Sequence, residues 1–451
     1  MATLEGHQHR QRWVLFFAIG LFAFAFRFYY VTHAQVLQPV NLANTRGDAV
    51  DYYRYARNLV VHRVFSISPE ETRPLISDSY RDPGYPLFMA AWMKVCPEWD
   101  SWYAAMLLSQ ALLGALTVVI MLSVGSRWMP LPWLAAAGML MAIWPHSVVI
   151  SSILLTETLV GFLCAAGLFC LRLTIDRSNR SWAAASGALL ALAALTNAVM
   201  LPVAPLLALY LLIRRQLCVS SVACLVAAVL ALTIPWAIRN TTLPPSDASS
   251  SGRALTNFVQ GSWPIFQSVY QAAMQGDPNA KVVMAEVDAE AISIRANPAN
   301  GLRTIWKRLK SDPSTYIRWY LSKPSLLWSW DIQIGQGDIY VYPTRNSPFE
   351  TNMFYRIVAA ICHSLNPVLF YLMLSACLLA FLPDQRTRPE MAATALMMIF
   401  ITAVYSTLQA EPRYASPLRG MEIMLAMSAT CRGSYSLIRI RNEHRTKPIN
   451  E

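Results

Sequence analysis

Long apolar segments limit what this chain can fold into. Most approach or exceed the roughly twenty residues that a helix needs to cross the hydrocarbon core of a bilayer. They cover residues 13–31, 103–124, 131–150, 153–171, 183–195, 198–213, 218–238, 354–382, 391–408 and 415–437. The composition agrees, because 55% of the residues are hydrophobic and only 14% are charged. We therefore predict an all-α polytopic membrane protein, with about ten transmembrane helices.

Basic residues account for the net charge of +11, and they lie mainly beside the apolar segments. Membrane orientation explains this placement better than a nucleic-acid partner does, because cytoplasmic loops are enriched in Lys and Arg. With a cytoplasmic N-terminus, these residues all fall on the cytoplasmic side: Arg10, Arg12, Arg127, Arg172, Arg177, Arg180, Arg214, Arg215, Arg386, Arg388, Arg439, Arg441 and Lys447. We expect a bacterial inner-membrane protein with both termini in the cytoplasm, in contact with membrane lipids and binding no nucleic acid.

This orientation leaves two long connections outside, at residues 34–100 and 239–353. The sequence thus predicts a transmembrane module over 1–238 with its first outer loop at 34–100, a periplasmic loop over 239–353, and C-terminal helices with a tail over 354–451. Both outer loops are expected to carry interfacial helices. Residues 302–310 combine four basic side chains with Trp306, as in a helix at the membrane surface. Because loops on a rigid scaffold usually carry specificity, we expect the segment 239–353 to select the molecule on which the protein acts.

The first outer loop reads RGDAVDYYRYARNL over residues 46–59. Tyr52, Ala56 and Leu59 recur at helical spacing, which predicts a short amphipathic helix with Asp48 at its N-cap or in its first turn. Capping alone would explain Asp48.

A rigid turn follows in the sequence YRDPGYPLFMA, residues 80–90, where two prolines and a glycine precede an apolar stretch. Such a turn would hold Arg81 at the membrane surface. Contact with lipid headgroups and contact with a substrate explain Arg81 equally well.

The third polar feature is Glu157, which directly precedes an apolar run. A carboxylate facing lipid at this point would be costly. Two roles remain open: a carboxylate favoured by the positive end of the helix dipole, or a second acid facing a water-filled cavity.

Taken in order, these motifs resemble the C-type glycosyltransferases (GT-C), in the bacterial branch related to protein O-mannosyltransferases and lipid A aminoarabinose transferases. The Gly-Asp loop helix, the Arg-x-Pro-Gly-Tyr-Pro turn, Leu-Thr-Glu at 155–157, Leu-Thr-Asn at 195–197 and a late Arg-Tyr at 413–414 carry the resemblance. It covers residues 13–214 well and the rest loosely.

The resemblance implies an inverting transfer, in which an acceptor hydroxyl attacks a sugar linked to a polyprenyl phosphate. A carboxylate must then take the hydroxyl proton, and Asp48 stands at the family's position for it. Asp51 is the nearest second acid, so the choice between the two stays open. Glu157 completes the expected catalytic set.

The departing phosphate needs positive charge rather than a general acid. By motif position Arg81 and Arg413 would supply it, with Tyr414 beside them, and Lys323 or Arg239 could add to them from the second outer loop. The alternative for Arg413 is a pair with Glu411. Where the family often has Arg after Leu-Thr, this chain has Asn197, so that contact is missing or supplied elsewhere.

Substrate contacts are expected from Tyr52, Tyr85 and His146, although a lone histidine at a helix end is more often structural. The partners implied are a polyprenyl-phosphate-linked sugar and an acceptor glycan, glycolipid or protein. The sequence shows no ligand cluster that demands a metal, and a divalent cation that assists is left open.

Two other functions compete with this prediction. An oligosaccharide ligase would use a lipid pyrophosphate donor on the same scaffold. A flippase or transporter of polyprenyl-linked sugars would place its charges near the membrane midplane, often in two related halves, whereas these candidates lie at helix ends and in loops.

Overall fold

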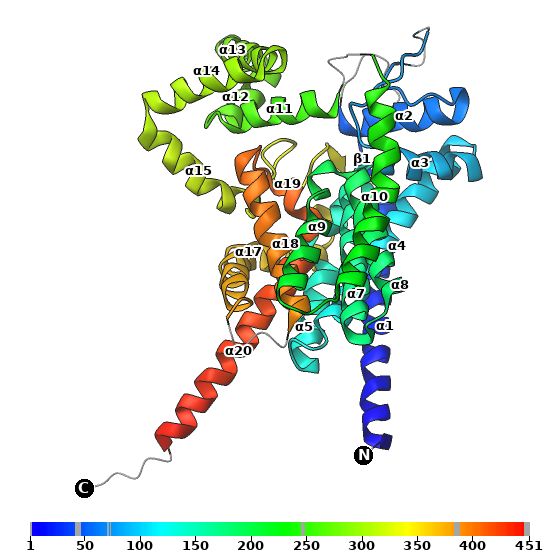
Figure 1. Ribbon diagram of the computed structural model, residues 1–451, viewed down its shortest axis with the longest axis vertical. Coiled ribbons are helices and arrows are strands. Elements are labelled where there is room, and N and C mark those ends of the chain that lie inside the picture. The colour runs from blue at the N-terminus through cyan, green and yellow to red at the C-terminus, as the bar shows by residue number, and fades with distance from the viewer. Residues whose placement is uncertain are drawn as a thin grey trace.

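Membrane-spanning helices dominate the fold (Figure 1). The computed structural model describes residues 2–40, 47–69, 72, 74–244, 249–382 and 388–445, with the backbone alone at 2–9 and 435–445. In this part of the chain, six helices are long and apolar enough to cross a membrane. They are α1 (Ala2–His33), α4 (Trp99–Gly125), α7 (Glu157–Arg177), α10 (Val219–Thr241), α17 (Met353–Leu379) and α18 (Pro389–Thr407). The chain is therefore a multi-pass, all-α membrane protein.

The expected count of about ten spans is not confirmed. A seventh span results if α5 (Leu131–Ile143) and the segment Pro145–Ser152, which are bent by 52°, are taken together. The apolar runs at 183–195 and 198–213 form α8 (Arg180–Thr196) and α9 (Val203–Ile213), with only 17 and 11 residues. The last run forms α20 (Arg419–Arg445), which opens with a buried ion pair between Arg419 and Glu422.

Close helix packing builds one large apolar core through the bundle, in which α8 lies against both α7 and α10. At Gly187 an added Cβ would collide with the carbonyl of Leu225, so the backbones of α8 and α10 approach too closely for any side chain.

The bend between α5 and α6 (Pro145–Val149) has a clear cause. Pro145 cannot donate a backbone hydrogen bond, so carbonyls at the end of α5 lose their helical partners. The buried side chain of Arg27 replaces those partners, because its guanidinium donates to the carbonyls of Ala142 at 2.8 Å and Met141 at 3.3 Å. Arg27 thus fixes the bent segment that leads toward Glu157.

The remaining elements gather mainly at the end of the bundle opposite both termini, here called the upper end (Figure 1). They are β1 (Gln35–Val36), α2 (Asp48–His62), α3 (Gly84–Val95), η1 (Ile150–Ser152), η2 (Ala198–Met200), α11 (Ser250–Gly261), α12 (Phe266–Met274), α13 (Pro278–Ala296), α14 (Pro298–Ser311), α15 (Pro313–Leu327), β2 (Thr344–Arg345), α16 (Pro348–Thr351), α19 (Pro412–Ala415) and η4 (Ser416–Leu418). β1 and β2 pair antiparallel, with Gln35 opposite Arg345. The amphipathic helices expected near 48–59 and 302–310 are present as α2 and α14. Helices α11 to α14 enclose a small apolar core of their own.

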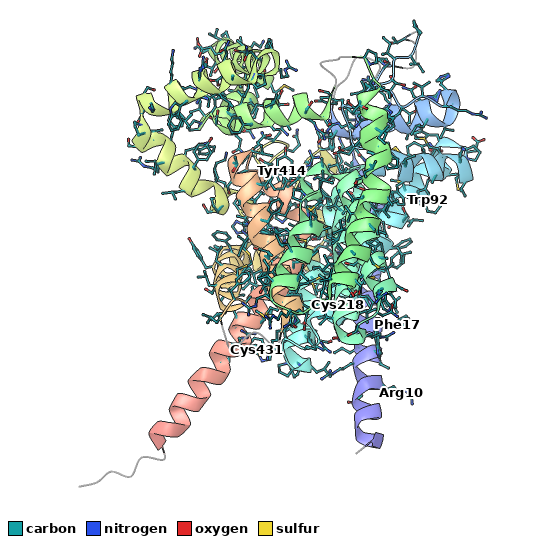
Figure 2. The ribbon with its side chains drawn as sticks, viewed as in Figure 1. Arg10, Phe17, Trp92, Cys218, Tyr414 and Cys431 are labelled. Carbon is teal, nitrogen blue, oxygen red and sulfur yellow. The ribbon has the colours of Figure 1, made fainter. Side chains whose placement is uncertain are left out.

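Figure 2 places Tyr414 toward the upper end, and Arg10, Cys218 and Cys431 toward the lower one. Of the basic residues used to predict orientation, Arg386 and Lys447 lie outside the described residues. The side chains at 439 and 441 are also outside the described set.

Candidate active site

The first turn of α2 carries the central carboxylate of the site. Gly47 occupies the N-cap, and Asp48 follows as the first helical residue without capping it. Asp48 therefore does not cap α2. The hydroxyl of Tyr342, from the segment before β2, accepts a hydrogen bond from the backbone amide of Ala49 at 3.3 Å and so fixes this turn. One turn further, Asp51 lies on the same face of α2.

Arg81 joins these two carboxylates from the turn before α3. Its Nη2 donates to Asp48 Oδ1 at 2.5 Å and to Asp51 Oδ2 at 2.7 Å, and its Nε donates to Asp51 Oδ2 at 3.1 Å. The guanidinium lies 5.2 Å from the ring centre of Tyr52 and 5.1 Å from that of Tyr80. The proline-glycine turn therefore directs Arg81 inward to α2.

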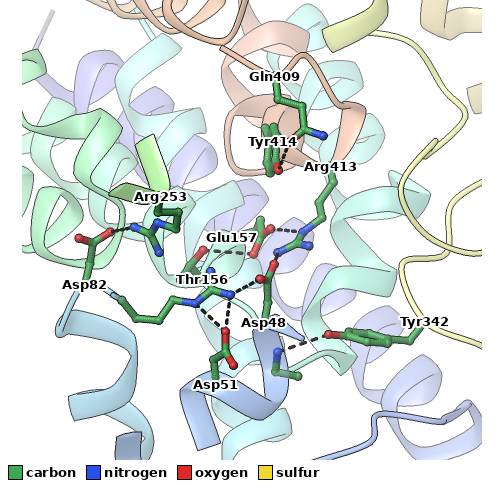
Figure 3. Close-up of polar contacts among 12 residues, drawn as sticks. Asp48, Asp51, Asp82, Thr156, Glu157, Arg253, Tyr342, Gln409, Arg413 and Tyr414 are labelled. Atoms are coloured by element: carbon green, nitrogen blue, oxygen red, sulfur yellow. Dashed lines mark hydrogen bonds and ion pairs between the residues drawn. The ribbon is translucent and has the colours of Figure 1, made fainter. Parts of the chain in front are cut away.

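Arg413 approaches the same carboxylate from α19, on the opposite side (Figure 3). Its Nη2 donates to Asp48 Oδ2 at 2.5 Å, and its Nε donates to Glu157 Oε1 at 2.6 Å. Glu157 begins α7 and is 4% exposed, and its other oxygen accepts from the hydroxyl of Thr156. Asp51, Arg81, Asp48, Arg413 and Glu157 thus form a row of alternating charges, which we call the five-residue charge row.

The pair of Arg413 with Glu411, given above as the alternative role of Arg413, does not form. Glu411 instead accepts from the backbone amide of Gln333 at 2.9 Å and from the side-chain amide of Gln267 at 3.1 Å. Burial raises the pKa of Glu411 to about 7, against the lowering effect of backbone hydrogen bonds from Ile334 and Gln333 and of the charge of Arg413. Glu411 therefore connects the segment 239–353 to the end of α18.

Opposing effects set the protonation of Asp48. Burial alone would raise its pKa, but the positive charges of Arg81 and Arg413 outweigh burial and hold the pKa well below the usual range. The carboxylates in turn raise the pKa of both arginines, against the lowering effect of burial. In this state Asp48 is ionised and both of its oxygens are bound.

A cavity of about 230 Å³ opens beside the charge row. Asp48, Arg81, Glu157 and Arg413 reach its wall, whereas Asp51 lies behind Arg81 and does not. The other polar and aromatic side chains in the wall are Tyr52, Tyr80, Asp82, Thr156, Thr196, Asn197, Ser250, Arg253, Asn257, Tyr405, Gln409 and Tyr414. Tyr414 stacks on Tyr405 with their ring centres 5.0 Å apart.

Besides Asp51, three predicted site residues do not reach this cavity. Lys323 is fully buried, and its ammonium donates to the backbone carbonyls of Gly261, at 2.7 Å, and Leu408. Burial lowers its pKa to about 7. His146 bonds with the carbonyl of Trp330 at 2.7 Å, and the hydroxyl of Tyr85 donates to Gln110 at 2.8 Å. Their contacts are those of structural groups.

Asp82 and Arg253 also line the cavity, and sequence reasoning missed both. Arg253 on α11 pairs with Asp82 at 3.0 Å, and Asp82 also accepts from the backbone amide of Ala198 at 3.1 Å. Because Asp82 directly follows Arg81, the sequence could have suggested that Asp82 belongs to the site. No sequence pattern links Arg253 to Asp82, which lies about 170 positions earlier. Arg253 and Asn197 both line the cavity. Asn197 stands where the resembled family often has Arg after Leu-Thr, and Arg253 brings a guanidinium group to the same cavity.

The carboxylates offer a divalent cation poor ligands. Among the described residues no group of three or more His, Cys, Asp and Glu side chains could hold a metal ion. Both oxygens of Asp48 contact guanidinium groups, and Arg413 stands between Asp48 and Glu157. A cation placed between these carboxylates would have to displace the guanidinium of Arg413 from Asp48 and Glu157.

The fold of this chain has counterparts among solved structures. It is similar to the oligosaccharyltransferase of Archaeoglobus fulgidus in the apo form, with 13% identity and a TM-score of 0.51, over 96% of this chain and 52% of that one. The same protein in complex with Zn and sulfate has 14% identity and a TM-score of 0.51, and the match covers 94% of this chain and 49% of that one. The apo form of ArnT from Cupriavidus metallidurans has 18% identity and a TM-score of 0.39, and the match covers 88% of this chain and 77% of that one.

The chain spans about half the length of the oligosaccharyltransferase that it matches. No family model matches the sequence, and no curated protein matches it. The structural likeness supports the all-α membrane fold that the sequence predicts.

Proposed function

We propose that this protein is an inverting glycosyltransferase that moves a sugar from a polyprenyl-phosphate donor to an acceptor hydroxyl at the periplasmic face of a bacterial inner membrane. The upper end of the bundle would be that face. The observation that carries the proposal is Asp48, held between Arg81 and Arg413 at the wall of a cavity. A base and two phosphate-binding cations are the groups that this transfer requires.

The transfer can be written with these residues. The acceptor oxygen attacks the anomeric carbon and forms the new glycosidic bond, while its proton passes to a carboxylate oxygen of Asp48. The bond between that carbon and the phosphate oxygen breaks with its electron pair. Polyprenyl phosphate leaves with an added negative charge, which Arg81 and Arg413 stabilise.

Asp48 is a better candidate for the base than Asp51. Asp48 reaches the cavity wall, whereas Asp51 is 2% exposed and lies behind Arg81. In this mechanism Asp51 and Glu157 are positioning residues, which fix the guanidinium groups of Arg81 and Arg413.

An ionised carboxylate bound to two guanidinium groups is a weak base, so donor binding must change Asp48. The donor phosphate is an anion that competes with Asp48 for Arg81 and Arg413. As the arginines turn to the phosphate, the pKa of Asp48 rises and its oxygens become free to accept a proton. The donor would therefore activate its own base, and a site without donor would stay inactive.

Arg253 supplies a third positive charge in the cavity, near Asn197. Its partner Asp82 also binds the backbone at Ala198, so Arg253 is held at the junction of α3, α8 and α11. In the resembled family an arginine often stands at the position of Asn197. We assign to Arg253 the phosphate contact that this arginine would make.

The main alternative is an oligosaccharide ligase with a lipid pyrophosphate donor. The fold likeness to an oligosaccharyltransferase favours it, although this chain spans only half of that protein. The two functions leave different lipid products, polyprenyl phosphate and polyprenyl pyrophosphate, which mass spectrometry separates.

Deletion and complementation test the proposal. Deleting the gene should change the mass of one class of cell-envelope glycan, and the wild-type gene should restore it. Asp48→Asn should insert in the membrane and fail to restore it. Asp176→Asn is the matched control, because Asp176 also lies between two arginines, Arg127 and Arg172, but toward the opposite end of α7. Full restoration by Asp48→Asn would eliminate Asp48 as the base.

A further inference from the structure

A second cavity, of about 440 Å³, adjoins the first between α11 and α13. Tyr80, Arg253 and Asn257 line both cavities, so the two share a wall. The new side chains are Thr256, Gln260, Asp288, Ala291, Ile292 and Arg295. We call this space the α11–α13 groove.

Hydrogen-bonding capacity is left over in this groove. The side chains of Asn257, Gln260 and Asp288 make no hydrogen bond or ion pair with the described residues of the chain, although the two amides are half-buried. Half-buried polar groups without protein partners must bind water or a ligand, since leaving them unpaired is costly. Two such amides, together with the exposed carboxylate of Asp288, face one groove and mark it as a place where a polar molecule can bind.

The chemistry of the walls fits a sugar. Two amides, a carboxylate and the guanidinium of Arg295 present donors and acceptors together, as the hydroxyls of a sugar ring require. A volume of about 440 Å³ falls within the usual range for ligand pockets.

A peptide fits less well. Peptides bind through apolar side-chain pockets or an open strand edge. The aliphatic residues of the groove are Ala291, which is buried, and Ile292, which is 58% exposed.

The position of the groove connects it to the reaction. Helices α11 and α13 are not among the membrane-spanning candidates, and Asp288 and Ile292 on α13 are exposed at the groove. Arg253 contributes to both cavities and pairs with Asp82, next to Arg81. A sugar in the groove would direct a hydroxyl past Arg253 toward Asp48.

We propose that the α11–α13 groove binds the carbohydrate part of the acceptor, with Gln260 and Asp288 as residues that determine specificity. This inference rests on the proposed function and adds the class of acceptor, a glycan, carried by a lipid or free. It assigns acceptor recognition to two helices of the segment 239–353.

Photo-crosslinking in living cells tests the proposal. A benzophenone amino acid replaces Asp288, which is exposed on the groove face of α13. The matched control replaces Glu286, an exposed acid two positions earlier and therefore about 160° around the same helix. We expect glycan adducts at 288 in clear excess over 286. A lipid on the adduct would identify a glycolipid, and its absence a free glycan. Peptide adducts, or no excess over 286, would overturn the proposal.

A rate measurement avoids the bulky side chain. Membranes from the deletion strain retain donor and acceptor, and purified protein is added to them. Asp288→Ala should raise the acceptor concentration needed for half-maximal transfer about tenfold, as expected for one lost hydrogen bond to a charged group. Glu286→Ala should behave as wild type. Equal behaviour of the two variants would contradict a role for Asp288.

Binding of undecaprenyl phosphate to the purified protein separates the two proposals. If wild type and Asp288→Ala bind this lipid equally, the donor site is intact. The crosslinking result then tests only whether the α11–α13 groove binds the acceptor. If wild type does not bind it, the proposed function fails, whatever the crosslinks show.

Discussion

Replacing Asp48 with Asn tests whether this carboxylate competes with the donor phosphate. Asp48 forms two contacts of 2.5 Å, one with Arg81 and one with Arg413, which a phosphate must displace to bind the same groups. Asn keeps the shape and removes the charge. We therefore expect Asp48→Asn to bind undecaprenyl phosphate more tightly than wild type, while transfer is lost.

The magnitude follows from the geometry. Two unit charges about 4 Å apart attract by about 4 kcal/mol at an effective dielectric constant of about 20. The side chain of Asp48 is 28% exposed, and Asn keeps a hydrogen bond, so the net gain falls to about 1–2 kcal/mol. The dissociation constant should then decrease about 5- to 30-fold.

Native mass spectrometry of the protein in nanodiscs, titrated with undecaprenyl phosphate, measures this change. The control is Asp176→Asn, which removes a comparable charge from a similar arginine pair toward the opposite end of α7. An unchanged or weaker affinity in Asp48→Asn would refute the competition. An equal decrease of the dissociation constant in both variants would show that the change comes from the net charge of the protein and not from competition at this site.

Three further variants test the surroundings of the site. Arg413→Gln should lower the free energy of unfolding by about 3–5 kcal/mol, because it leaves Glu157 buried and charged; adding Glu157→Gln should recover most of the loss in thermal melts, and no recovery would contradict the pairing. Glu411 has a raised pKa of about 7, so the folded state binds its proton more tightly than the unfolded state, and stability should fall as pH rises from about 4.5 through 7. Glu411→Gln should flatten that part of the melting-temperature profile, and an unaltered profile would count against the assignment. Arg27→Met should lower the melting temperature, because the carbonyl of Ala142 loses its donor at a cost of about 1–3 kcal/mol; a melt identical to wild type would show that the bend needs no such donor.

Motif order anticipated much of the charge row. Asp48, Asp51, Arg81, Glu157 and Arg413 were all candidates, and they come together at the upper end of the bundle. A charged side chain at the end of an apolar segment is costly unless it has a partner, so its presence marks a site even without structural information.

The partners themselves were not predictable. Of the two roles considered for Arg413, the pair with Glu411 does not form, and its partners within the chain are Asp48 and Glu157. Lys323 was expected near the phosphate, and its ammonium binds backbone carbonyls. Each outcome depends on how α15, α18 and α19 pack, and local sequence does not encode the distances between helices that lie far apart along the chain.

The sequence by itself determined that the chain crosses a membrane several times and places its acids and arginines at helix ends, because the bilayer penalises any other arrangement. Only the tertiary structure decided which apolar runs are long enough to span. It also decided which arginine faces which carboxylate, and that α11 brings Arg253 to the cavity. Those choices depend on helix packing, where a shift of a few ångströms makes or breaks an ion pair.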